Sequence, residues 1–163
     1  MGVEIERKFR VPGQQWRSSV RRSRSIAQGY LSTEADRTVR VRVDDDRGVL
    51  TIKGRAKGLV RREFEYEIPP GDAQQMLDEF CQGRRVEKIR HEVVVGDHLW
   101  VVDEFRGANR GLVVAEVELA RPDEEFMMPQ WAGEEVTGEV RYYNARLAEY
   151  PYRQWCEDEG VRG

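Results

Sequence analysis

The sequence is poor in several features, and each shortage narrows what the protein can be. It has only two cysteines, Cys81 and Cys156, which argues against a disulfide framework, and neither has the spacing of zinc ligands. No stretch approaches the roughly 18 consecutive apolar residues of a membrane span. The N-terminus has no apolar signal-peptide core. We therefore expect a cytoplasmic protein with free thiols and no membrane partner.

The sequence also lacks a strong excess of charge of either sign. Its 27 basic and 30 acidic residues leave a net charge of −3, which argues against a nucleic-acid-binding protein. Charged residues nevertheless make up 35% of the chain, against roughly 25% in typical globular domains. The 163 residues suit one domain spanning 1–163 with a real core. Two dense, opposed populations of charge must therefore coexist in one domain.

Strand patterns dominate, separated by turns rich in glycine and aspartate. We expect strands near residues 3–11, 27–32, 37–45, 48–54, 60–68, 85–95, 99–106 and 112–120. This number and spacing favour a mainly β (α+β) antiparallel barrel or sandwich.

Helical spacing follows two of these strands, and a third stretch is ambiguous. A helix is expected from an N-cap at Asp72 to Gly83, and a second from near Arg141 to Pro151. The arginine-rich stretch 16–25 is most simply a solvated helix or loop.

The polar faces of the strands carry almost nothing but charge. In the opening strand Glu4, Glu6 and Lys8 alternate with apolar residues, so they share one face. The same pattern recurs, sorted by strand: positions 4/6, 63/65 and 116/118 are acidic, whereas 40/42, 53 and 88/90 are basic. Like charges directly across a sheet are destabilising.

Two interpretations of these faces remain open from the residues alone. In one, they form a solvated sheet surface. In the other, a closed barrel turns them into a lumen and helices cover its apolar outside. Such a lumen would suit a metal–polyphosphate complex, because arginine and lysine bind phosphoryl oxygens and glutamates bind Mg²⁺ or Mn²⁺.

Taken together, these motifs resemble the CYTH superfamily, also called triphosphate tunnel metalloenzymes, and most closely its small single-domain bacterial members. The signature ExExK is Glu4, Glu6 and Lys8; "QGYL" starts at Gln28; the RxR strand is Arg40 and Arg42; and "LTIKG" supplies Lys53. The RxExE strand is Arg61, Glu63 and Glu65, "RRVEKIR" supplies Lys88 and Arg90, "VDEF" supplies Asp103, and "AEVEL" supplies Glu116 and Glu118. The closing motif "EVTGEVRYYN" contains Arg141, Tyr142 and Asn144.

The resemblance implies an eight-stranded antiparallel β-barrel tunnel with a charged lumen and a few helices outside. It also implies metal-dependent hydrolysis of a triphosphate. The phosphates would be bound by Lys8, Arg40, Arg42, Lys53, Arg61, Lys88 and Arg90, with Arg141 closing one mouth. One or two Mg²⁺ or Mn²⁺ ions would be held by Glu4, Glu6, Glu116 and Glu118, with Asp103 as a further ligand. The catalytic set would be Lys8, Glu63 and Glu65, the two glutamates orienting water.

Alternatives to these assignments remain. For Asp103, a salt bridge to a lumen arginine competes with metal binding. We expect inorganic tripolyphosphate as substrate, cleaved to pyrophosphate and phosphate. Rival functions are an adenylate cyclase, a thiamine or nucleoside triphosphatase, and a non-catalytic sensor of polyphosphate or nucleotide. Exposed apolar strand faces would also allow a homodimer.

Overall fold

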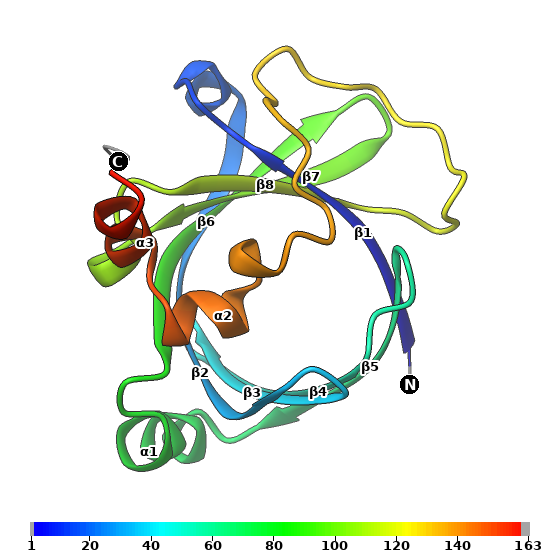
Figure 1. The fold of residues 1–163 in the computed structure, drawn as a ribbon. Coiled ribbons are helices and arrows are strands. Elements are labelled where there is room, and N and C mark those ends of the chain that lie inside the picture. The colour runs from blue at the N-terminus through cyan, green and yellow to red at the C-terminus, as the bar shows by residue number, and fades with distance from the viewer. Residues whose placement is uncertain (1, 161–163) are drawn as a thin grey trace.

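Alternating apolar and charged residues let the strands close around a charged interior. The computed structural model describes residues 2–160, which form a closed antiparallel barrel with the strand order β1-β5-β4-β3-β2-β6-β7-β8 (Figure 1). The strands are β1 (Gly2–Arg10), β2 (Val20–Glu34), β3 (Arg37–Asp44), β4 (Arg47–Gly54), β5 (Val60–Ile68), β6 (Arg85–Val95), β7 (His98–Phe105) and β8 (Val113–Glu118). The predicted eight-stranded barrel is confirmed.

Short helices accompany the barrel. The α-helices are α1 (Pro70–Phe80), α2 (Asn144–Glu149) and α3 (Tyr152–Asp158), and the 3-10 helices are η1 (Gln15–Ser19), η2 (Gly107–Asn109) and η3 (Val140–Tyr142). Over residues 2–160, no helix has both the length and the apolar character needed to cross a membrane.

The solvated helix or loop expected over 16–25 is the 3-10 helix η1 up to Ser19 but strand from Val20, so strand β2 is longer than predicted. It begins at Val20 and pairs with β6 from Val20 to Gly29, so most of the arginine-rich stretch is strand. A register shift between Val20 and Arg22 interrupts the alternation on which a strand prediction depends. Pairing with β6, a long-range contact, therefore decides the local structure.

The apolar core has parts on both faces of the barrel wall. Helix α1 packs through Ala73 and Leu77 on Val41 of β3. Helices α2 and α3 pack through Leu147 and Trp155 on Val86, Phe105 and Val114, which alternate in phase with lumen residues and therefore lie on the inner strand faces. Connecting segments and α1 remove the outer apolar side chains from water, and α2 and α3 cover those in one part of the interior.

The C-terminal helix prediction was only partly right. Residues 141–151 form η3 and then the short α2, and α3 after Pro151 was not predicted. Its signal was present, because Tyr152, Trp155 and Cys156 follow helical spacing and are all buried. Helix α1 likewise begins at Pro70, two residues before the expected cap, with proline in its first turn.

The two halves of strand β1 pair with different strands. Residues 2–5 pair with β5, whereas residues 6–10 pair with β8. Beside the second half, segment 133–136 bonds to β1 from the other side: Gly133 N donates to Arg10 O at 2.7 Å, and Val136 N donates to Lys8 O at 2.8 Å. This segment leads the chain to η3 and α2, which lie within the outline of the barrel (Figure 1).

Candidate active site

The barrel encloses a cavity of about 1240 Å³. Side chains alternate between the two faces of a strand, so burying Ile5 and Phe9 in the outer core turns Glu4, Glu6 and Lys8 inward. The predicted site residues that line the cavity are Glu4, Glu6, Lys8, Arg40, Arg42, Lys53, Arg61, Glu63, Glu65, Lys88, Arg90, Glu116 and Glu118. The structure therefore favours the charged lumen over a solvated sheet face.

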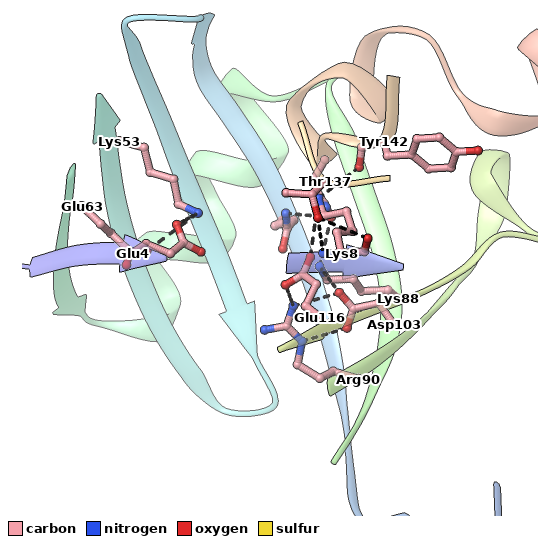
Figure 2. Close-up of polar contacts among 12 residues, drawn as sticks. Glu4, Lys8, Lys53, Glu63, Lys88, Arg90, Asp103, Glu116, Thr137 and Tyr142 are labelled. Atoms are coloured by element: carbon pink, nitrogen blue, oxygen red, sulfur yellow. Dashed lines mark hydrogen bonds and ion pairs between the residues drawn. The ribbon is translucent and has the colours of Figure 1, made fainter. Parts of the chain in front are cut away.

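Two lumen lysines lie beside carboxylates. Lys53 Nζ is 2.7 Å from Glu4 Oε2 and 3.9 Å from Glu63 Oε1 (Figure 2). Lys8 Nζ is 3.6 Å from Glu116 Oε1. Burial alone would raise the pKa of Glu4. The charge of Lys53 and a hydrogen bond between Glu4 and Glu6 instead lower it to about 2. These pairs hold opposite charges in place across the lumen.

Asp103 has a different place from the one predicted for a metal ligand. Its side chain is 1% exposed and lies on the inner face of the barrel, opposite Arg90, without lining the cavity. Lys88 Nζ and Arg90 Nη2 both donate to its Oδ2 at 2.8 Å, and Arg90 Nε donates to Oδ1 at 2.8 Å (Figure 2). Burial would raise the pKa of Asp103, but the two cations hold it well below its usual value. The structure supports the salt-bridge interpretation, since both carboxylate oxygens are occupied.

Three lumen arginines form no ion pair with any carboxylate in residues 2–160. Arg40 Nη2 donates to Thr51 Oγ1 at 3.1 Å, and Arg61 Nη2 donates to Thr38 Oγ1 at 3.0 Å. Arg42 donates to the side-chain amide oxygen of Gln28. The Arg40 side chain is buried, and its Nε has no hydrogen-bond partner within the described chain. A buried donor without an acceptor is costly, so an acceptor in the lumen beside Arg40 would be favourable.

The lumen glutamates lie close enough together for their negative charges to repel one another. Burial, Glu116 and Glu4 raise the pKa of Glu6 well above its usual value. Burial, Glu4 and Glu63 likewise raise the pKa of Glu118. These oxygen donors suit Mg²⁺ or Mn²⁺, which would relieve the crowding of negative charge. Between residues 2 and 160, no three acidic, histidine or cysteine side chains lie close enough to ligate one ion, so one or two carboxylates with water and phosphate oxygens would complete its shell.

Arg141 points away from the cavity, and its predicted role in closing the mouth of the tunnel stays a prediction. Its Nη1 donates to Glu159 Oε1 at 2.8 Å, and its guanidinium lies 4.0 Å from the ring centre of Trp155. It is not part of the cavity wall. Residues of the following segment line the cavity instead, including Tyr143 and Arg146. The 3-10 turn of η3 directs Arg141 outward toward α3.

Sequence reasoning gave no role to several uncharged residues that hold the lumen cations. Thr38, Thr51 and Gln28 are buried beside arginines, and Asn144 contacts Lys88. A signal existed for Thr51, which shares a strand face with Lys53. Arg24 was also overlooked: it lines the cavity and pairs with Asp44 at 2.8 Å.

The fold and lumen agree with comparisons to known proteins. The CYTH domain family model matches residues 2–149, and the chain belongs to this family. A curated relative, the inorganic triphosphatase of Acetivibrio thermocellus, is 44% identical over 157 residues, covering 96% of this chain and 100% of the relative. The inorganic triphosphatase of Nitrosomonas europaea is 37% identical over 150 residues, covering 90% and 97%.

Solved structures give the same result. The crystal structure of the inorganic triphosphatase NE1496 superposes with a TM-score of 0.66 at 34% identity, covering 91% of this chain and 96% of that one. The PH1012 protein of Pyrococcus horikoshii has a TM-score of 0.57 at 20% identity, covering 73% and 80%. The second similarity concerns the fold alone.

Proposed function

We propose that this protein is a triphosphatase that hydrolyses inorganic tripolyphosphate to pyrophosphate and phosphate with Mg²⁺ or Mn²⁺. The observation that carries the proposal is a set of three arginines that face the cavity without carboxylate partners, the buried Arg40 and the half-buried Arg42 and Arg61. Their charge is available to a polyanion. The names of the two curated relatives support the same substrate.

The cations would bind and align the phosphate chain. Charge-assisted hydrogen bonds contribute about 1.5–3 kcal/mol each, and the lumen presents such donors from several strands. Lys8 and Lys53, now paired with glutamates, would exchange part of that contact for phosphoryl oxygens. Phosphoryl transfer demands mainly positioning and charge stabilisation from a protein, and this wall supplies both.

The glutamates would divide into two groups. Glu4, Glu6, Glu116 and Glu118 would hold the metal, which supplies charge neutralisation and a more acidic bound water. Glu63 and Glu65, on the same wall, would orient the attacking water and accept its proton. Burial raises the pKa of Glu63, which favours proton acceptance.

The cavity offers little to a nucleobase. In the described part of the chain, Tyr30 and Tyr143 are the tyrosines in its wall. The Tyr30 hydroxyl accepts a hydrogen bond from Gln28 at 2.8 Å, and the ring of Tyr143 lies 5.5 Å from Lys8 Nζ. Because the ring of Tyr30 is buried and that of Tyr143 is in contact with Lys8, we expect a higher kcat/KM for tripolyphosphate than for ATP.

A phosphate-release assay tests the proposal. Tripolyphosphate, ATP and thiamine triphosphate are compared with Mg²⁺, with Mn²⁺ and with chelator, and nucleotide products are separated by chromatography. Release from tripolyphosphate only with metal supports the proposal. Cyclic AMP and pyrophosphate from ATP would indicate a cyclase, preferential cleavage of ATP or thiamine triphosphate would indicate a different triphosphatase, and tight binding without turnover would indicate a sensor.

Two further expectations stay predictions, namely a cytoplasmic location and a homodimer. Val3 and Tyr66 are each 56% exposed on the outer surface of β1 and β5. Light scattering after size exclusion would test whether these side chains join two copies.

A further inference from the structure

Two uncharged amides, Gln28 and Asn144, lie among the lumen cations. Gln28 is fully buried on β2, and its Oε1 accepts from Arg42 Nε at 3.0 Å and from Arg42 Nη2 at 2.7 Å. Its Nε2 donates to the Tyr30 hydroxyl at 2.8 Å and to Asn144 Oδ1 at 3.3 Å. Both ends of the amide are engaged, which fixes its orientation and thereby that of the Arg42 guanidinium.

Asn144, at the start of α2, continues this network. Its Oδ1 also accepts from Lys88 Nζ at 3.0 Å. One chain of hydrogen bonds therefore runs from Arg42 on β3 through Gln28 and Asn144 to Lys88 on β6. Both cations line the cavity, whereas Gln28 lies buried beside Arg42 on the same inner face without lining it.

The absence of charge on these two residues has a physical consequence. Asp103 shows the alternative: its carboxylate holds Arg90 firmly, and it also offsets positive charge. Gln28 offers the guanidinium an acceptor in the same manner but leaves its charge intact. Arg42 forms no ion pair with the carboxylates of residues 2–160, so its charge is uncompensated at close range.

We propose that Gln28 and Asn144 are positioning residues for the substrate. Their uncharged hydrogen bonds fix Arg42 and Lys88, and they leave the charge of Arg42, which has no carboxylate partner, available to the phosphate chain. The proposal rests on the proposed function for the identity of the anion. It assigns the two amides no contact with the reacting atoms. Their effect is on where the cations lie and how much charge they present.

Carboxylate variants separate these two effects. Gln28→Glu and Asn144→Asp keep an acceptor oxygen beside the cation and add one negative charge. Aspartate is also favourable in the first turn of a helix, so Asn144→Asp is expected to fold. Gln75→Glu is the matched control, because Gln75 is exposed on α1 and outside the cavity. Calorimetric titration with tripolyphosphate in chelator measures affinity without turnover, and melting in the same buffer measures stability.

We expect both carboxylate variants to melt at or above the wild-type temperature while binding tripolyphosphate about tenfold more weakly, the equivalent of one lost charge-assisted hydrogen bond. With metal present, KM should rise more than kcat falls. Gln75→Glu should match wild type in both measurements. Wild-type affinity in Asn144→Asp and in folded Gln28→Glu would overturn the proposal and leave the triphosphatase assignment standing. Weakened binding in these variants of a protein that never hydrolyses tripolyphosphate would support the positioning role and reject the proposed function.

Discussion

Glu6 lies directly opposite Glu118 in the ladder between β1 and β8, and both side chains line the cavity. Adjacent like charges destabilise a sheet. Lys8, two residues along β1, is opposite Glu116 and forms an ion pair with it. The repulsion is therefore concentrated between Glu6 and Glu118. A divalent cation at this place would convert a destabilising contact into a binding site.

Metal should therefore stabilise the protein, and removal of one glutamate should reduce that effect. Wild type in Mg²⁺ or Mn²⁺ should melt higher than in chelator, with a gain of about 2.7 kcal/mol at a metal concentration 100 times Kd. Glu6→Gln should melt higher than wild type in chelator, gain less from metal and lose turnover. The exposed Glu67→Gln is the control. Equal gains in wild type and Glu6→Gln, measured by scanning calorimetry, would contradict this site.

Arg40 and Arg141 should respond oppositely to truncation. Arg40→Ala removes a buried cation from the lumen and should weaken tripolyphosphate binding about tenfold or more. Arg141→Ala removes an exposed stacking contact with Trp155, so it should lower the melting temperature slightly and leave KM unchanged. Steady-state kinetics and melting of both variants provide the comparison. A raised KM in Arg141→Ala alone would show that Arg141 takes part in substrate binding.

Asp103→Asn should destabilise the barrel strongly. It leaves Lys88 and Arg90 buried together without their shared carboxylate, and breaking a buried ion pair costs about 3–5 kcal/mol. Tripolyphosphate should restore part of this loss because it brings negative charge to the same cations. Urea unfolding with and without tripolyphosphate measures both effects. Asp123→Asn, on an exposed loop, is the control, and equal stability of the two variants would refute the structural role.

The stability of the protein should rise with pH because of Lys88. Burial, with Arg90 and Arg42 nearby, lowers the pKa of Lys88 to about 7 from 10.5, although Asp103 opposes the shift. Between these values the unfolded chain binds more protons than the folded one, so the free energy of unfolding increases with pH. Below about pH 7 Lys88 is protonated in both the folded and the unfolded chain, so this gain in stability is absent. Lys88→Met should flatten the difference in urea unfolding between pH 7 and pH 10, and a wild-type slope in that variant would count against it.

Much of the fold and the cavity wall was predictable, because period-two alternation fixes which side chains share a face. Once the barrel closes, Glu4 and Arg40 must both point inward. The outward turn of Arg141 was not predictable, since it depends on the packing of α3 against the barrel. Nor was the role of Gln28, because an amide in a strand becomes a partner for Arg42 only when two strands are in register.

The divided pairing of β1 also bears on when the protein can fold during synthesis. The second half of β1 requires residues 113–118 on one side and segment 133–136 on the other, so these partners leave the ribosome long after β1 itself. A nascent chain shorter than this carries an unpaired β1 edge, which is a template for aggregation. Pairing between such distant parts of the chain is also slow. Barrel closure is therefore a late event in synthesis, and chaperone contact with the N-terminal strand would be most valuable just before it.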